Sequence, residues 1–380
     1  MPGDYLHGVE QFFLDDPNRP IVILAASTIG LVATADDADA ATFPLGVPVL
    51  CNSDKLIAKA GTTGTLRNAL KDIYRQTGAV VVVVRQAEED VEADQIAEVI
   101  GGIDNETGSY SGIKALLAAE SLVGVKPRLL IAPEFSQLPA VGAALESTAK
   151  KMNAIPIIDG DESGYSPVIA ACATYQEAYF VNGGARLFDV DQAAEVGRYA
   201  SATVAGHIVR VDNEEGYWHS PSNRKVYEIL GSREIIDFAV GSKTCKANLY
   251  NSENVSCLVR KQGGLYLRGN RLANGIMLPH QRIRYLVGDS IMQAHEEYVD
   301  GNVTKGYVEF VTDRVNKLLR RLTLRKVISG GKCWVDKELN ISAIGTSQVF
   351  WDYDLGFYDV AERMTFRQHV TDSYNQAIFE

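Results

Sequence analysis

The sequence predicts a doubly wound, largely parallel α/β sheet that is followed by a second, α+β part. The first supporting observation is the run AVVVVVRQ at 79–86, an all-apolar strand of the kind that is buried on both faces. The second is that such runs alternate with stretches of helical periodicity up to residue 183, a pattern typical of parallel sheets. The third is that two long helical stretches between 280 and 326 end this alternation.

Apolar density and β-branched residues mark the strands of the first part. The predicted strands lie at 20–35, 79–86, 128–135, 154–159 and 178–183. The predicted helices lie at 62–78, 94–102, 112–121 and 139–153, with a helical turn at 175–178. The stretch at 62–78, for example, has Thr at its start, apolar residues at helical spacing and Gly78 at its end.

The second part has a different pattern, with two long helices and then short strands. The helices are predicted at 280–300 and 307–326, and the strands at 332–340, 349–356 and 363–370. The turn SPSN at 220–223 is expected to lead into a helix that begins near Ser222 or Asn223. Because the pattern changes near 250–265, we divide the chain into 1–19, 20–255, 256–356 and 357–380.

Composition and charge exclude several classes of protein. A net charge of −11 argues against a nucleic-acid-binding protein, which would show a basic balance. The five cysteines are an odd number without a C-x-x-C pair, a pattern of free thiols in a reducing compartment. The start has no secretory signal, and the most apolar window, 21–26, is far too short to cross a bilayer. We therefore expect folding in the cytoplasm, with no nucleic acid and no membrane insertion.

The motifs that could carry chemistry are incomplete. Gly61 and Gly64 precede a helix and could hold an anion, but the Lys of a P-loop and the third Gly of a dinucleotide site are missing. The acidic stretch at 158–167 resembles a calcium loop, but its twelfth position is Ala170 instead of Glu. GSYSG has Tyr110 where a nucleophile elbow has Ser. We predict no catalytic, cofactor or metal site; a cytoplasmic α/β enzyme or nucleotide-binding protein that uses the Gly61–Gly64 loop is the alternative.

Several motifs follow one another along the chain in a characteristic order. They are YLHGVEQFF at 5–13, KPRLLIAPEFSQLPAV at 126–141, WHSPSN at 218–223 with Gly231, LRGNRL at 267–272, IRY at 283–285 and VAERMTF at 360–366. This ordered set resembles the contractile tail sheath proteins, the family of phage tail sheaths and of the sheaths of R-type pyocins. Arg268 stands where the family's W-G-x-R-T-L motif has Trp.

The resemblance implies a structural polymer and not an enzyme. Sheath subunits assemble as stacked six-membered rings around a rigid tail tube, and a baseplate trigger releases a contraction that drives the tube through a target envelope. The expected partners are further copies of the chain, the tail tube protein, and baseplate and tail terminator proteins, with no cofactor. Assembly is expected in the bacterial host cytoplasm, as part of a phage tail or a phage-tail-like particle.

In these terms the divisions become an N-terminal arm (1–19), an α/β outer domain (20–255), an α+β tube-facing assembly domain (256–356) and a C-terminal arm (357–380). Chain ends fray unless they are held, and a neighbour's sheet edge can hold them by strand addition. Edge strands within the chain's own fold are the alternative. The residues expected in the inter-subunit arms are Tyr5, Val9, Phe12, Phe13, Met364, Phe366 and Val370.

The helix predicted at 307–326 sorts its apolar and basic residues onto adjoining faces. The apolar face consists of Val311, Val315, Leu318, Leu319 and Leu322. The basic stripe consists of Arg314, Lys317, Arg321 and Arg325. The family resemblance suggests that this stripe docks on an acidic tube, and a merely solvated basic face is the alternative.

The motif residues are expected to have structural roles. They are Trp218, Pro221, Ser222, Asn223, Gly231, Gly269 and Arg271. We expect the stretch at 216–231 to fix the α/β domain against the assembly domain, with Trp218 as a packing residue and with Pro221 and Asn223 shaping the turn.

Overall fold

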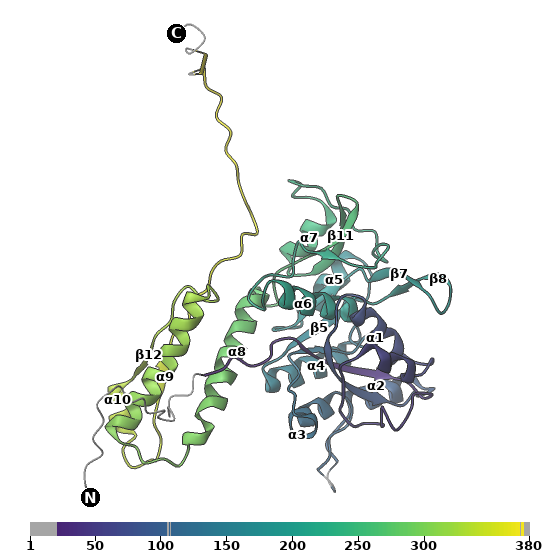
Figure 1. Ribbon diagram of the computed structural model, residues 1–380. Helices are drawn as coiled ribbons and strands as arrows, with labels where there is room; N and C mark the ends of the chain where they lie inside the picture. The colour runs from purple at the N-terminus through teal and green to yellow at the C-terminus, as the bar shows by residue number, and fades with distance from the viewer. Residues whose placement is uncertain (1–20, 105, 107, 373, 376–380) are drawn as a thin grey trace, which may run out of the picture.

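The computed structural model describes residues 21–372 except 105 and 107, together with residues 374–375. Within these residues the chain forms a large α/β body, a smaller helical unit and an extended C-terminal segment that leads away from both (Figure 1). The predicted α/β class with a largely parallel sheet is confirmed.

One nine-stranded sheet forms the centre of the α/β body. Its order is β2-β3-β1-β4-β5-β6-β10-β11-β9. The strands are β1 (Thr28–Thr34), β2 (Val49–Cys51), β3 (Val80–Gln86), β4 (Leu129–Ile131), β5 (Ile155–Asp159), β6 (Tyr179–Asn182), β9 (Lys225–Val226), β10 (Ser256–Lys261) and β11 (Gly264–Arg268). The six strands from β3 to β10 run parallel, whereas β2, β11 and β9 pair antiparallel at the two ends.

Helices cover both faces of the sheet because its central strands are apolar on both faces. Two consecutive residues of β1 show this, because Leu31 packs into one core cluster and Val32 into the other. One face is covered by α1 (Leu66–Tyr74) and α6 (Ser201–Glu214). The other is covered by α2 (Glu92–Ile100), the 3-10 helix η2 (Gly112–Ala118), α3 (Ala119–Val123), α4 (Pro139–Met152), α5 (Tyr165–Cys172) and α7 (Lys246–Ser252). A further 3-10 helix, η1 (Asp54–Lys59), follows β2.

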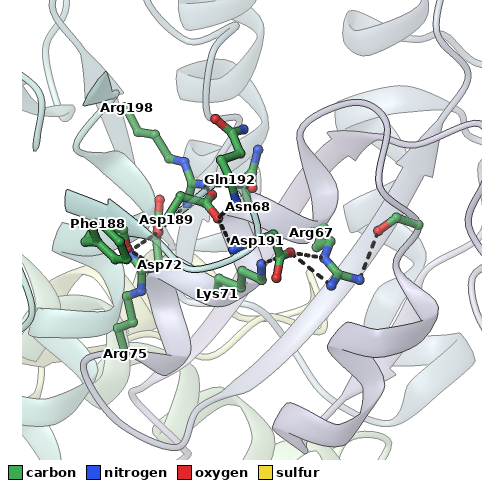
Figure 2. A network of polar contacts seen from close by, with 11 residues as sticks. Arg67, Asn68, Lys71, Asp72, Arg75, Phe188, Asp189, Asp191, Gln192 and Arg198 are labelled. Carbon is green, nitrogen blue, oxygen red and sulfur yellow. Dashed lines mark hydrogen bonds and ion pairs between the residues drawn. The ribbon is translucent and has the colours of Figure 1, made fainter. Parts of the chain in front are cut away.

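A hairpin of β7 (Ala185–Asp189) and β8 (Ala194–Arg198) is bound to α1 by buried charges (Figure 2). Arg198 donates to the Asp72 carboxylate at 2.8 Å and also pairs with Asp189. Burial raises the pKa of Asp72 to about 6, although Arg198 and Arg75 act in the opposite direction. These pairs fix the hairpin on the body.

The smaller unit is built from two helices and a two-stranded sheet. It contains the 3-10 helix η3 (Glu296–Tyr298), α9 (Lys305–Leu324), α10 (Lys337–Ser342), β12 (Cys333–Val335) and β13 (Trp351–Tyr353). Helix α9 begins where the Thr304 hydroxyl accepts a hydrogen bond from the Tyr307 N–H. All five residues of its predicted apolar face are buried, which confirms that part of the prediction.

Helix α8 (Leu278–His295) lies between the two parts (Figure 1). One side of it packs against the α/β body and the neighbouring side against the smaller unit. Toward the α/β body, Arg282 pairs with Asp212 of α6 with both side chains at most 4% exposed. About two turns further along the helix, Asp289 accepts from Lys126, Arg128 and Asn153. Toward the smaller unit, its apolar side chains join one cluster with α9. That cluster includes Ile283, Val287, Val315, Leu318, Leu319 and Leu322.

The predicted strand at 20–35 is wrong in its first half, because this apolar run serves two cores. Only Thr28–Thr34 is a strand. Ile21 is buried against α8 and α9, and its carbonyl accepts a hydrogen bond from Arg321. Val22, the next residue, is 72% exposed. The segment at 21–27 therefore connects the α/β body to the smaller unit and adds nothing to the sheet.

Three further predictions of secondary structure are wrong. The stretch after SPSN forms the edge strand β9, not a helix, because it pairs with β11. The helix near 175–178 lies earlier, as α5. The predicted strand at 332–340 stops at Val335 because Asp336 caps α10 by accepting from the Leu339 N–H.

The sheet extends beyond the boundary predicted at 255/256. Strand β10 pairs parallel with β6, and β11 follows it as a hairpin, so the α/β body continues to Arg268. The sequence patterns did not reveal α6, α7 or the β7–β8 hairpin. Helix α6 was missed because almost all its residues are buried, so its sequence lacks the amphipathic pattern of a surface helix.

A buried carboxylate holds the start of α6 against the sheet. Asp159, at the end of β5, accepts from the Ser201 N–H at 2.8 Å and from the Ser136 hydroxyl at 2.9 Å. Burial raises the pKa of Asp159 to about 6, even though these hydrogen bonds favour the charged form.

We predict that Arg282→Ala lowers the free energy of unfolding by about 3–5 kcal/mol, because it leaves the Asp212 carboxylate buried without its cation. Urea titration of the isolated chain measures this change. The control is Arg224→Ala, which removes a pair with Glu215 whose side chains are 41% and 32% exposed. That variant should lose less than about 1 kcal/mol. Equal losses in the two variants would contradict a supporting role for the buried pair.

We also predict that Asp159 makes the free energy of unfolding depend on pH. Its pKa is higher in the folded chain than the ordinary 3.8, so the folded state binds the extra proton between these values. The contribution of Asp159 is therefore complete below about pH 4 and is lost as pH rises through about 6, by roughly 2–3 kcal/mol. In urea titrations across that range Asp159→Asn should lose this contribution and keep the one from Asp72, whose pKa burial also raises to about 6. The exposed Asp161→Asn should keep both, and a parallel pH profile of parent and Asp159→Asn would refute the assignment.

Candidate functional site

Most of the motif residues line one groove of 1010 Å³ at the junction of the α/β body, α8 and the base of the C-terminal segment. The motif residues in its lining are Trp218, Ser222, Asn223, Gly269 and Arg271. Two others do not belong to this lining. The Pro221 carbonyl instead accepts a hydrogen bond from His207 of α6, and Gly231 forms a β-bridge with Arg186 of β7.

The SPSN turn is held on the end of β11 by hydrogen bonds. The Ser222 hydroxyl accepts from the Gly269 N–H at 3.1 Å, and the Asn223 N–H donates to the Leu267 carbonyl at 2.7 Å. Gly269 has φ +137°, and a Cβ there would lie 2.1 Å from the Ser256 hydroxyl. Only glycine fits at this position, because β10 lies directly beside it.

Trp218 lies where α6 ends and the smaller unit begins. Its ring packs edge-on against Tyr217 at 5.2 Å, and both rings contact the apolar cluster of α8 and α9. Gly216 has φ +108°, and a Cβ there would meet the Trp218 ring at 2.6 Å. Trp218 therefore contacts both parts of the molecule.

The C-terminal segment forms one wall of the groove and then leaves the body. Residues 357–372 form no strand in the described chain, so the strand predicted at 363–370 is not formed within the subunit. The three predicted arm residues there, Met364, Phe366 and Val370, are 73%, 88% and 91% exposed. The four N-terminal arm residues, Tyr5, Val9, Phe12 and Phe13, lie outside the described residues.

The four residues of the predicted basic stripe of α9 do not form one exposed surface. Arg314 is buried, with its guanidinium 4.9 Å from the centre of the Tyr298 ring and near Glu297. Arg321 is half-buried and donates to the Ile21 carbonyl. Lys317 and Arg325 are exposed. The spacing of charges alone did not reveal this, because aromatic residues of η3 and α9 cover Arg314.

The exposed basic residues at this end of α9 are therefore a different set. They are Lys317 and Arg320 of α9 together with Arg325 and Lys326, which directly follow its last residue; we call the set the basic face of α9. The set keeps two members of the predicted stripe.

The Gly61–Gly64 loop already holds an anion that belongs to the chain. The N–H groups and hydroxyls of Thr62 and Thr63 all donate to the Asp37 carboxylate, at 2.7–3.1 Å. These hydrogen bonds, from the Thr62 hydroxyl first, lower the pKa of Asp37 well below its usual range. Gly64, with φ +65°, would place a Cβ 2.3 Å from the Thr34 carbonyl. The loop is a closed turn, which disfavours the nucleotide-binding alternative.

The carboxyl end of β6, at the sheet edge where α/β proteins bind ligands, is also covered by the chain itself. The N–H groups of Arg233 and Glu234 donate to the Gly183 carbonyl after β6, and the Glu234 carboxylate accepts from Asn182 at 2.6 Å. Among the described residues no group of His, Cys, Asp or Glu could hold a metal ion. No described helix is both long enough and apolar enough to span a membrane.

Some residues at this junction were not singled out from the sequence. Glu362 pairs with Arg271 at 2.7 Å, and His280 of α8 stacks on Phe357. Glu362 is part of the AER motif, so the motif already indicated that this residue has a role. Its partner could not be identified because the two residues are 91 positions apart.

Known proteins that are similar to this chain agree with the predicted family. Residues 26–85 match the family model described as the tail sheath protein Gp18 domain III N-terminal region. A putative prophage major tail sheath protein of Pseudomonas aeruginosa is 33% identical over 97% of each chain. The tail sheath protein of Escherichia phage P2 is 32% identical over 98% of this chain and 97% of its own.

Solved structures agree in fold. A chain of the contracted helical sheath of the anti-feeding prophage superposes with a TM-score of 0.69 over 96% of this chain and 99% of its own, at 14% identity. A chain of the contracted PVC sheath complex, an extracellular contractile injection system, gives 0.68 over 98% of each chain, also at 14% identity. The full-length sequence relatives confirm a structural protein and not an enzyme: this chain belongs to the contractile tail sheath protein family.

Proposed function

We propose that the chain polymerises as stacked six-membered rings around a tail tube, and that contraction of this polymer drives the tube through a target envelope. The observation that carries the proposal is the C-terminal segment, which exposes large apolar side chains and forms no strand within the described part of its own subunit. Such a segment needs a partner, and membership of the sheath family supports another copy of the chain as that partner. Assembly in the bacterial host cytoplasm, into a phage tail or a phage-tail-like particle, belongs to the same proposal.

The C-terminal arm acts by adding a strand to a neighbouring subunit. In the extended conformation backbone N–H and C=O groups can pair with an open sheet edge. About five backbone hydrogen bonds, at roughly 1 kcal/mol net each, would hold two subunits together. The N-terminal arm at 1–19 has the same role in this proposal. Linked in this way, the folded bodies can reorient between two packings while the polymer stays connected.

The small β12–β13 sheet is the edge that receives an arm. In the described chain each of its two strands pairs only with the other, and the Asn316 side chain of α9 occupies the outward N–H and C=O groups of Cys333 on β12, so β13 provides the open edge. A two-stranded sheet is marginal in water, so it gains stability from a third strand. Trp334 of β12 and Tyr353 of β13 are 40% and 39% exposed, which leaves apolar surface for the alternate side chains of an added strand.

The basic face of α9 docks on an acidic tail tube. Its four residues are exposed, so their interactions with the tube would be weak and screened by salt. Weak contacts suit this role, because a contracting sheath must release the tube. The further partners in this proposal are the baseplate, which triggers contraction, and the tail terminator.

We expect Arg367→Pro/Gln368→Pro to abolish polymers while the monomer stays folded. Proline removes two adjacent N–H donors, so one is lost on whichever side of the strand faces the partner. Negative-stain electron microscopy scores the polymers, and circular dichroism scores the monomer. The control, Arg367→Ala/Gln368→Ala, loses the same side chains but keeps the backbone donors and should assemble. Normal polymers from the proline variant would exclude strand addition at this site.

We expect Lys317→Glu/Arg320→Glu/Arg325→Glu to weaken co-sedimentation with purified tail tubes more than self-assembly without tubes. The effect should shrink as salt rises, because the contacts are exposed. The control is Lys150→Glu/Lys151→Glu/Lys243→Glu, which changes net charge equally at exposed sites on the α/β body. Equal tube binding by the two triple variants would argue against docking through α9.

A further inference from the structure

The base of the C-terminal segment is attached to the start of α8 before the chain leaves the body (Figure 1). The His280 ring stacks on Phe357, with centroids 4.7 Å apart and planes at 13°. The same ring lies with Nε2 3.0 Å from the Tyr358 carbonyl oxygen. These two contacts fix the position of the segment at 357–358 but leave the direction of the chain beyond it undetermined.

A second attachment lies at Glu362. Arg271 Nε is 3.2 Å from both Glu362 carboxylate oxygens, and its Nη2 donates to one of them at 2.7 Å. From the other side, Arg271 Nη1 donates to the Gly275 carbonyl at 2.9 Å. The planar guanidinium is thus held on the body while its fork faces the carboxylate, an arrangement that fixes direction as well as distance.

Exposure rises directly after this pair. Tyr358, before the pair, is 51% exposed, whereas Met364 and Phe366, after it, are 73% and 88% exposed. The groove lined by the sheath motifs ends at the same place, since Glu362 and Arg363 belong to its lining. The Arg271–Glu362 pair therefore lies where the arm changes from attached to free.

We propose that Arg271 is a positioning residue for the C-terminal arm: by binding Glu362 it sets the direction in which the arm leaves the subunit. This inference rests on the proposed exchange of arms between subunits. Glycine is required at 269, and Arg271 lies two residues beyond it on the loop that the SPSN turn holds. The groove lined by the motif residues thus holds Arg271 in place. The SPSN and LRGNRL motifs both serve to position this residue.

The partial exposure of the pair sets the size of the effect. Water and salt screen a pair of this kind, so losing it should shift the ratio of attached to detached arms by about 1.5- to 5-fold. A shift of this size is small in one subunit, but every subunit of a polymer must direct its own arm. The bias therefore acts at each joint of the lattice.

The position of the arm can be measured in the isolated full-length chain. All five native cysteines are buried, so cysteines introduced at the exposed Val240 and Met364 can be spin-labelled selectively. The parent should give one narrow distance distribution. Arg271→Ala should broaden it and lower the attached fraction about 1.5- to 5-fold. The swap Arg271→Glu/Glu362→Arg should restore part of the narrow peak, whereas Arg271→Lys, which lacks the fork, should stay intermediate.

The matched control is Arg363→Ala, which removes the same charge one residue further along the arm and should leave the distribution narrow. A broad distribution in the parent, or an unchanged one in Arg271→Ala, would overturn the proposal. In polymerisation assays the yield of Arg271→Ala should fall and that of the swap should recover. Unchanged yield beside a broadened distribution would also overturn it, because the direction of the arm would then not matter.

These outcomes separate the inference from the proposed function. If a chain truncated after Arg363 polymerised normally, arm exchange itself would fail, and the distance measurement on Arg271→Ala would still report whether the pair directs the arm. If truncation abolished polymers while Arg271→Ala behaved like the parent in both assays, arm exchange would stand and Arg271 would have no positioning role.

Discussion

The attachment of α8 to the α/β body by buried ion pairs is the constraint on which the rest of the molecule depends. Arg282 and Asp289 lie on one face of this helix and both point into the body, where they meet Asp212 and the Lys126–Arg128 pair. A buried charge that loses its partner is expensive, so the body cannot slide along the helix by a turn without separating both sets of charges. The register between α8 and the sheet is thereby fixed.

The other attachment of α8 has a different character. Toward α9 its contacts are apolar, and hydrophobic contact has no preferred direction. This side can therefore accept small adjustments at much lower cost than the charged side. The molecule consists of a body to which α8 is joined by buried ion pairs, and of a smaller unit packed against α8 through apolar side chains. In the proposed function, such a division suits a subunit that changes its packing against its neighbours.

The α/β body has the topology of ligand-binding proteins, but its own side chains occupy the places where a ligand would bind. Asp37 accepts hydrogen bonds from the N–H groups of the Gly61–Gly64 loop, and Glu234 covers the end of β6. Both are carboxylates in positions where an anionic ligand would otherwise accept the hydrogen bonds. The fold thus forms a compact block, whereas the extended C-terminal segment leaves its large apolar side chains exposed.

Much of this protein could be predicted from its sequence, because some signals are local. The all-apolar run at 79–86 requires burial on both faces, and the spacing of apolar residues from Val311 to Leu322 requires one buried helix face. The order of the motifs was enough to indicate the sheath family. Other features depend on contacts between distant residues. The run at 20–35 divides between two cores, aromatic rings cover Arg314, and Arg271 meets Glu362 only because the SPSN turn and α8 bring them together. Local patterns determine which side chains must be buried, whereas the tertiary structure decides against which partner, since that choice depends on how elements far apart in sequence pack.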